Sequence, residues 1–228
     1  MYVQIRNLKF KYRNAKELTI KDFSVDIEDG EIVSILGESG SGKSTMLRLL
    51  SGLEAPESGM IKIRNDVMAD KNHFVMPEKR GVGMVFQDYA LFPHMMVRDN
   101  IKFGLIKMSG KEKDQRVEEV LKLVDMIDYG KRYPHELSGG QQQRIALARA
   151  LAPKPSVLLL DEPFSNLDSH LQESIRTELK RIIKKAGITS IFVTHDKKDA
   201  LEIADRVIVL KEGEIIEDGV PRDVLKIA

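Results

Sequence analysis

Short apolar runs recur along the chain, and several are separated by longer segments whose apolar residues lie three or four positions apart. The first pattern is typical of buried strands, and the second of helices that bury one face. The strands expected from these runs are Val3–Phe10, Glu31–Leu36, Met60–Ile63, Val82–Phe86, Val157–Leu160, Ser190–Val193, Val207–Leu210 and Glu214–Ile216. Because strands and helices alternate, the pattern predicts an α/β fold with a mostly parallel sheet.

Two helices are marked by capping boxes, in which a serine is followed three positions later by Glu or Gln. Ser109 and Glu112 open the first helix, and Ser169 and Gln172 open the second. The apolar positions are Val117, Val120, Leu121 and Val124 in the first helix and Leu171, Ile175, Leu179, Ile182 and Ile183 in the second. Both helices are therefore expected to pack one face against a core.

The stretch from about Asp88 to Ala152 has a helical pattern almost throughout, and it interrupts the alternation of strands and helices. The strand pattern resumes after Pro153-Lys154-Pro155. We therefore expect an inserted helical subdomain at 88–152, within an α/β core formed by residues 1–87 and 153–228.

A glycine-rich loop follows the expected strand at 31–36 and reads Gly37, Glu38, Ser39, Gly40, Ser41, Gly42, Lys43, Ser44 and Thr45. Its glycines let backbone N–H groups turn inward around an anion, and the helix that starts near Lys43 presents its positive end to phosphate. Lys43 reaches the β- and γ-phosphates, and the Ser44 hydroxyl is a ligand for Mg²⁺. The loop therefore predicts a nucleoside triphosphate bound with magnesium.

Three other strand ends carry residues suited to phosphoryl transfer, and ligands of open α/β sheets bind beyond the carboxyl ends of strands. Asp161 is expected to hold the magnesium shell, and Glu162, which follows it, to act as general base on the attacking water. Gln87 either ligates magnesium or positions water, and His195 contacts the γ-phosphate and holds the nucleophile in place.

Each of these residues also has an ordinary structural interpretation. Asp161 is compatible with a turn cap, Glu162 and Gln87 with solvent-facing side chains, and His195 with a structural histidine. The functional interpretation is favoured because the phosphate loop and three other strand ends supply complementary groups at one edge of the sheet.

A second glycine-rich turn, Leu137-Ser138-Gly139-Gly140-Gln141, precedes an apolar-periodic helix at Gln142–Leu151. Alone, such a turn is usually a plain helix cap, although its hydroxyl and amide groups also suit an anion. A chain with one phosphate loop offers no second phosphate for it. We therefore interpret the turn as serving the nucleotide of a second copy, in a two-fold dimer with shared sites.

Composition narrows the class of protein further. The net charge of +1 from 36 basic and 35 acidic residues provides no overall field for nucleic acid or anionic lipid. The absence of cysteine excludes disulfides and cysteine-ligated zinc, and it fits a reducing compartment. No apolar run approaches the roughly 18–20 residues of a membrane span, and the N-terminus lacks a signal-peptide core. We expect a soluble, cytoplasmic chain.

With these motifs in this order, the chain resembles the nucleotide-binding subunits of ABC transporters over nearly its whole length. The resembling motifs are the Walker A loop at Gly37–Thr45, the Q-loop glutamine at Gln87, the signature at Leu137–Gln141, Walker B with its catalytic glutamate at Val157–Glu162, the D-loop at Ser165–Asp168 and the switch histidine at His195. Tyr12 resembles the residue that stacks on adenine, although an aromatic residue there is also compatible with the core. Asn166 stands where alanine is frequent, and Asp199 where many members have glutamate.

The resemblance implies the cofactors ATP and Mg²⁺, and a P-loop NTPase core with an antiparallel N-terminal β part and an inserted helical subdomain. It also implies the roles of the site residues. Catalysis is assigned to Glu162, His195, Lys43 and Gln87; metal binding to Ser44, Gln87 and Asp161; and nucleotide binding to Tyr12, the loop Gly37–Thr45, Ser138, Gly139, Gly140, Gln141 and Asp168.

Finer resemblance separates subtypes of the family. The segments Gln87–Val97 and Asp161–Asp168 are similar to those of importers for polyamines, ferric iron, sulfate and sugars. The apolar stretch Tyr89–Val97 is the expected groove for the coupling helix of a membrane subunit, although half of it is compatible with the core. Close relatives in that group have an additional C-terminal β-rich regulatory domain, whereas the sequence ends at Ala228. No such domain is expected if the chain is a minimal cassette; the alternative is that the sequence was cut at this point.

The resemblance therefore implies a homodimeric or paired ATPase that binds two Mg-ATP and drives solute import through transmembrane permease subunits. A solute-binding protein is an indirect partner, nucleic acid is not one, and the expected location is peripheral on the inner face of the cell membrane. Two alternatives stay open: an exporter-type ATPase subunit, and an ABC ATPase that acts on DNA or ribosomes rather than in transport.

Overall fold

The computed structural model describes residues 1–165 and 169–226, and its centre is a six-stranded sheet. In spatial order the strands are β10 (Glu214–Gly219), β9 (Arg206–Lys211), β3 (Ile32–Leu36), β8 (Thr189–Thr194), β7 (Val157–Asp161) and β6 (Val82–Val85). All neighbouring pairs are parallel except β9 and β10, which form an antiparallel hairpin. The mostly parallel α/β sheet predicted from the sequence is confirmed.

The central strands are buried on both faces, which explains why their sequences are continuous apolar runs rather than alternating ones. In β3, Val33 and Ile35 belong to one core, whereas Ile32 belongs to the other. Successive side chains point to opposite faces of a strand, so each run supplies both cores. Both faces of the central sheet are therefore covered by hydrophobic cores. The edge formed by the carboxyl ends of its strands is available to carry a binding site.

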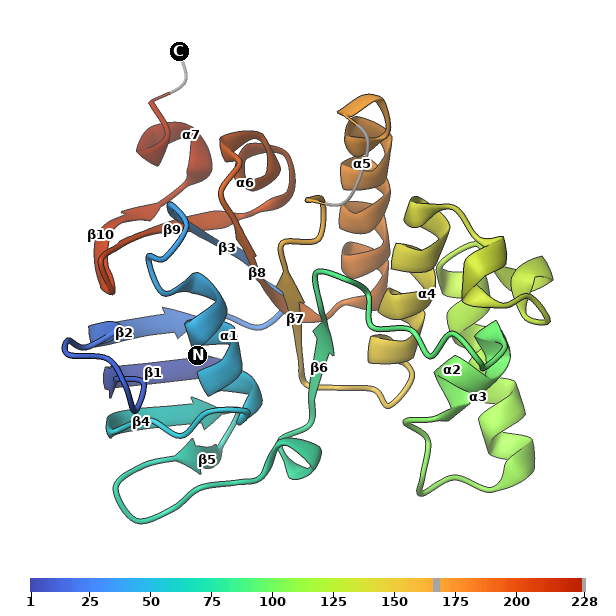
Figure 1. The fold of residues 1–228 in the computed structure, drawn as a ribbon, viewed down its shortest axis with the longest axis horizontal. Coiled ribbons are helices and arrows are strands. Elements are labelled where there is room, and N and C mark those ends of the chain that lie inside the picture. Colours follow the sequence, from blue (N-terminus) through green and yellow to red (C-terminus); the bar gives the residue numbers. More distant parts are fainter. Residues whose placement is uncertain (166–168, 227–228) are drawn as a thin grey trace.

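A second sheet is antiparallel and consists, in spatial order, of β2 (Ile20–Ile27), β1 (Val3–Phe10), β4 (Ser58–Ile63) and β5 (Asp66–Ala69). Helix α1 (Lys43–Ser51) contributes Met46, Leu47, Leu49 and Leu50 to the core shared by the two sheets. Figure 1 shows α1 beside the strands of this sheet and in front of the central one. The antiparallel N-terminal part is confirmed, although the sequence analysis missed β2 and β5.

Helices α4 (Gly139–Leu151) and α5 (Ser169–Ala186) cover the other face of the central sheet, and α2 (Val97–Lys102) and α3 (Gly110–Leu123) lie outside α4 (Figure 1). Between β6 and β7 every regular element is helical, but residues 103–109 and 124–138 are mostly turns with short 3₁₀ segments at Ile127–Tyr129 and Pro134–Glu136. The expectation of an almost wholly helical stretch was therefore too strong, because Gly104 and Pro134 interrupt it.

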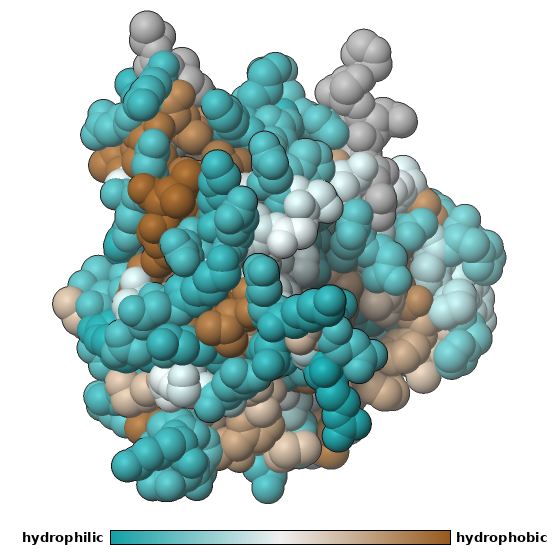
Figure 2. All heavy atoms as spheres, turned by 60° about the vertical axis from the view of Figure 1, so that its left-hand side comes forward, coloured by the Kyte–Doolittle hydropathy of each residue, from teal (hydrophilic) through white to brown (hydrophobic). Residues whose placement is uncertain are grey.

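The predicted capping box of Ser109 and Glu112 is confirmed at the start of α3. Three short helices complete the chain: the 3₁₀ helix Pro77–Lys79, α6 (Lys197–Ile203) and α7 (Pro221–Val224). Figure 2 shows a mostly hydrophilic face with apolar surface gathered near the C-terminal end, where β10 and α7 lie. Within the described residues, no helix combines the length and the apolar character that a bilayer span requires.

Candidate functional site

The phosphate loop lies between the carboxyl end of β3 and the start of α1, as the sequence predicts. The residue that caps the helix is Gly42, which has φ 105° and offers no side-chain cap, so the first N–H groups of α1 are left without a side-chain acceptor. Lys43 is 4% exposed, and its Nζ donates to the carbonyls of Gly37 (2.8 Å) and Glu38 (2.9 Å). The ammonium group is thus held inside the curve of the loop.

The loop rests on the β9–β10 hairpin, a support that the sequence analysis missed. A Cβ on Gly37 would lie 2.3 Å from the Leu210 carbonyl oxygen, so only glycine permits this approach. On the hairpin turn, Gly213 donates its N–H to the Ser41 carbonyl (3.1 Å) and accepts from the Lys21 N–H (2.9 Å). One turn thus joins the phosphate loop to the antiparallel sheet.

Ser44 and Asp161 face each other across the carboxyl edge, since the Ser44 hydroxyl donates to Asp161 Oδ1 at 2.9 Å. Burial raises the pKa of Asp161 above its usual value, and the Ser44 hydrogen bond opposes this shift. Burial likewise lowers the pKa of Lys43, against the attraction of Glu162 and Asp161. In both groups burial disfavours the charged form, and a metal beside Asp161 and phosphates beside Lys43 would favour it.

Glu162 has an unusual backbone, with φ 43° in the left-handed region that non-glycine residues seldom occupy. Its N–H donates to the Val193 carbonyl (3.2 Å), so the strained residue is fixed to the neighbouring strand β8. Its side chain is 22% exposed, and Oε2 lies 3.3 Å from Nδ1 of His195. Strain of this kind costs about 1–3 kcal/mol and concentrates at functional sites.

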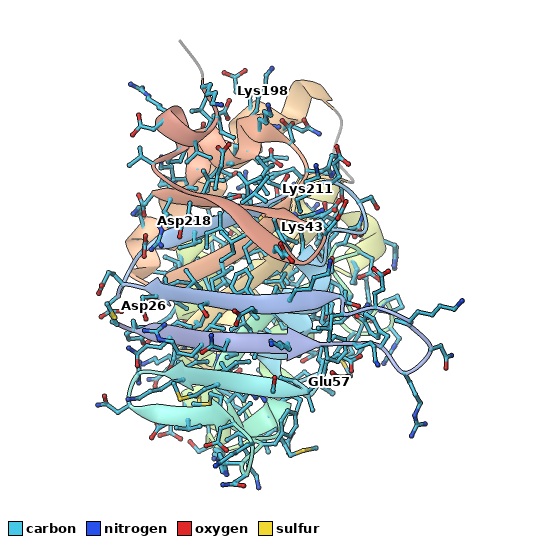
Figure 3. The ribbon with its side chains drawn as sticks, turned by 90° about the vertical axis from the view of Figure 1, so that its left-hand side faces the viewer. Asp26, Lys43, Glu57, Lys198, Lys211 and Asp218 are labelled. Carbon is cyan, nitrogen blue, oxygen red and sulfur yellow. The ribbon has the colours of Figure 1, made fainter. Side chains whose placement is uncertain are left out.

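The phosphate loop and both of these residues line one hollow of about 840 Å³. Its lining comprises Leu36–Ser41, Glu162, His195, Lys197, Val209–Glu212 and Ile216. Lys211, at the end of β9, is the basic residue that the hairpin adds to this lining, and it is labelled in Figure 3. Lys211 was not predicted from the sequence, because its position depends on how the hairpin folds over the loop.

Tyr12 and Gln87 are not among the residues that line this hollow. The Tyr12 hydroxyl is 3.1 Å from Thr45 Oγ1, and its half-buried ring packs edge-on against Phe10. Gln87 is exposed just beyond β6, the strand that pairs with β7. The predicted nucleotide residue Asp168 lies outside the described residues.

The second glycine turn is not among the residues that line the hollow. Ser138 caps α4 with a complete capping box: its Oγ accepts from the Gln141 N–H (3.4 Å), and its N–H donates to Gln141 Oε1 (2.9 Å). Ser138 is exposed, whereas a Cβ on Gly140 would lie 2.8 Å from Ile175 of α5. Gly140 therefore also serves the packing of α4 on α5.

Comparisons with known proteins agree with this geometry. The family model described as "ABC transporter" matches residues 20–165. The Fe(3+) ions import ATP-binding protein of Agrobacterium fabrum is 50% identical over 208 residues, which are 90% of this chain and 58% of that protein. The spermidine/putrescine import ATP-binding protein of Marinobacter nauticus is 47% identical over 225 residues, 97% of this chain and 58% of that protein.

Among solved structures, an ATP-binding cassette in a dimeric post-hydrolysis state with bound ADP and Pi matches with a TM-score of 0.80 and 37% identity. That match covers 96% of this chain and 99% of the cassette. By contrast, the chain spans about three fifths of the length of the two curated relatives. The matched model covers more than half of the chain and includes the phosphate loop, Asp161 and Glu162, so this chain belongs to the ABC transporter family.

Proposed function

We propose that the chain is an ATP-hydrolysing subunit that dimerises around two Mg-ATP and drives solute import through partner membrane subunits. One observation carries the proposal: Lys43, the Ser44–Asp161 pair and the Glu162–His195 pair meet at one edge of the central sheet. Lys43 would bind phosphate, Ser44 and Asp161 would be oxygen ligands of a metal ion, and Glu162 would be a base that His195 positions.

The chemistry of the donor set fits Mg-ATP. A hydroxyl and a carboxylate are oxygen ligands of the kind that Mg²⁺ accepts together with phosphate oxygens and water. Ser44 and Asp161 already point at each other, so a metal would replace the hydrogen bond between them. Gln87 would complete this set from the end of β6. The N–H groups of the loop and the Lys43 ammonium would hold the phosphates, and the Tyr12 ring would stack on the base.

Hydrolysis requires a base that faces the water beside the γ-phosphate, and Glu162 would be that base, since it lines the same hollow as the phosphate loop. The bound magnesium would neutralise charge that develops on the phosphate oxygens. Glu162 Oε2 would accept the proton of the attacking water, and the His195 imidazole, 3.3 Å away, would hold this carboxylate and the γ-phosphate in register.

The second glycine turn supports a shared site. Ser138 is exposed and the turn does not line the chain's own hollow, so Ser138 and the first amides of α4 would contact a nucleotide held by a second copy. Gly139, Gly140 and Gln141 would contribute from the same turn, and Asp168 from the loop after Glu162. In a head-to-tail pair with two-fold symmetry, each nucleotide would contact the phosphate loop of one copy and the Ser138 turn of the other.

A membrane partner would dock at Tyr89–Val97, which is partly built into the helical core. Tyr89 and Val97 are buried, and the residues between them include the half-buried Leu91, Phe92, Met95 and Met96. Asn100 is fully buried and fixes this loop, since it accepts from the Phe92 N–H and donates to the Phe92, Met95 and Met96 carbonyls. A partly apolar loop that is hydrogen-bonded to a buried side chain suits a permease helix.

In this proposal residues 1–87 and 153–228 are the ATP-binding core, and residues 88–152 are the subdomain that carries both the docking loop and the Ser138 turn. The chain would lie on the inner face of the cell membrane through its permease. Relatives named for ferric iron and for polyamines share up to half of their aligned residues with it. The transported solute would therefore be selected by the membrane subunits and a solute-binding protein.

Glu162→Gln tests the proposal most directly. We expect turnover of Mg-ATP to fall by about 10²–10³-fold, because the amide cannot accept the water proton. ATP-dependent dimers should persist and accumulate, since the phosphate and metal ligands are unchanged. Steady-state hydrolysis and size-exclusion chromatography with and without Mg-ATP measure the two effects.

Glu173→Gln is the matched control, because Glu173 is an exposed glutamate of α5 that does not line the hollow. It should hydrolyse ATP as the unmodified chain does. Normal turnover by Glu162→Gln would refute the assignment of the base, and absence of turnover in the unmodified chain would refute the ATPase proposal itself. Uptake assays in cells that lack this chain test import, and co-purification identifies the permease.

A further inference from the structure

A buried ion pair joins α5 to α6 and lines a small hollow together with Glu162 and His195. Arg176 of α5 and Asp199 of α6 have side chains that are 5% and 4% exposed, and Arg176 Nε donates to Asp199 Oδ1 at 2.6 Å. Taking two charges out of water is costly, so such a pair persists only where its geometry is well satisfied. We propose that this pair is a positioning device that holds His195 in register with Glu162; the inference rests on the proposed ATPase function.

The carboxylate side of the pair controls the turn that bears His195. The Thr194 hydroxyl donates to Asp199 Oδ2 (2.5 Å) and accepts from the Asp196 N–H (3.0 Å). His195 is the one residue between these two anchors, so its backbone is clamped on both sides while its side chain remains 62% exposed. Asp199 therefore fixes the backbone position of His195 without contacting its imidazole ring.

The guanidinium side reaches the loop that bears Glu162. Arg176 Nη2 donates to Gln172 Oε1 (3.2 Å), and Gln172 Nε2 in turn donates to the Phe164 carbonyl (3.2 Å), two residues after Glu162. The guanidinium carbon also lies 5.7 Å from the centroid of the Phe164 ring. A second bond, from Arg176 Nη2 to Asp196 Oδ2 (3.1 Å), ties it back to the His195 turn.

These contacts form one continuous connection from the β7–α5 loop to the β8–α6 turn, through α5. Between the loops is a hollow of about 50 Å³, lined by Glu162, His195, Arg176 and Asp199 among others. The Glu162–His195 distance of 3.3 Å spans the same gap. Because catalysis is sensitive to small displacements of reacting groups, loosening this connection should slow the chemical step more than nucleotide binding.

Asp199→Asn is the principal test, with Asp218→Asn as its matched control. Asp218 also pairs with an arginine, through two 2.6 Å bonds from Arg206, but Figure 3 shows it at the end of the sheet away from Lys43. We expect Asp199→Asn to lower kcat about tenfold or more while the Kd for a non-hydrolysable Mg-ATP analogue changes less than about threefold. Asp218→Asn should change neither.

Two further variants keep the test decisive. In Thr194→Val, valine is compatible with a buried strand, and only the hydroxyl that bonds to Asp199 and Asp196 is lost. This variant therefore tests the positioning of His195 if Asp199→Asn does not fold. It should lower kcat in the same direction. Asp199→Glu keeps a carboxylate for Arg176, so its kcat should lie within about threefold of that of the unmodified chain. The remaining difference in kcat would come from the longer side chain of glutamate.

The imidazole NMR signal of His195, identified by its loss in His195→Ala, gives a readout that needs no turnover. It should shift in Asp199→Asn and Thr194→Val and stay unchanged in Asp218→Asn. Unchanged kcat and an unchanged His195 signal in both variants would overturn the inference. Equal losses of kcat and nucleotide affinity would also overturn it, because they would indicate a general structural role. An unmodified chain that lacks turnover would instead refute the ATPase proposal.

Discussion

The two glycine-rich turns of this chain both precede a helix, but they meet different surroundings. The phosphate loop before α1 is enclosed by β3, the β9–β10 hairpin and Lys43, and it lines the large hollow. The turn before α4 is self-contained, since Ser138 and Gln141 satisfy each other and Ser138 is exposed. Figure 1 shows α1 among the strands, whereas α4 lies on the opposite side of β7.

The difference shows how much of a binding site one chain can build. The first turn gives up its side-chain cap, so its amides are available to a ligand, and other strands bring the remaining groups to it. The second turn keeps a full cap, and its residues are not among those that line the large hollow with Glu162 and His195. A turn of that kind acts on a nucleotide only if another surface presents one, which is the physical basis of the proposed dimer.

Ser138→Asp gives the largest expected effect on this comparison. Aspartate is as good a helix cap as serine, so α4 should keep its stability. Its carboxylate would repel the γ-phosphate of the nucleotide on the second copy, and turnover should fall about 10²-fold. Calorimetry with a non-hydrolysable Mg-ATP analogue at concentrations where the chain is monomeric should give an unchanged Kd.

Ser138→Asn is the neutral control, because asparagine also caps helices but adds no charge. It should lose much less activity than Ser138→Asp. If Ser138→Asp weakens binding to the monomer as strongly as it slows turnover, the second turn belongs to the chain's own site, and the contrast between the two turns disappears.

Mixed dimers provide a finer test. Lys43→Ala disables the first turn, and Ser138→Asp disables the second, so each variant alone forms inactive dimers. When equal amounts are mixed, half of the dimers contain one intact shared site, and about a quarter of the unmodified activity should return. Hydrolysis rates across a series of mixing ratios measure this recovery. A mixture that stays as inactive as its components would show that both turns serve the same copy.

Much of the fold was predictable because its signals are local. Continuous apolar runs identified the central strands, and β1 was predicted with its observed bounds, Val3–Phe10. β2 was missed because the pairing of β1 with β2 shifts register, with Asn7 and Asp22 at positive φ, which breaks the period of two. The strand β5 is only four residues long, too short for a periodic signal.

The site was predictable where each residue follows its own strand, because parallel strands deliver their ends to one edge. The sequence could not show what supports these residues from a distance. One signal was present: Arg176 lies three and seven positions before Leu179 and Ile183, so a charged residue stands on the apolar face of α5. A charge in that position predicts a buried partner, but only the fold identifies Asp199.

Gly213→Ala tests the support of the first turn and has the smallest expected effect. Gly213 has φ 82°, and an added Cβ would lie 2.4 Å from the Thr19 carbonyl oxygen, a backbone atom that cannot easily yield. Gly30→Ala is the control, since Gly30 has φ 72° with no atom within 4 Å of the added Cβ. The control should lose about 1 kcal/mol of unfolding free energy, and Gly213→Ala about 2–3 kcal/mol.

Because Gly213 also bonds to Ser41 of the phosphate loop, Gly213→Ala alone should weaken Mg-ATP binding, by about threefold. Equal binding by the two variants would mean that the loop holds its shape without the hairpin.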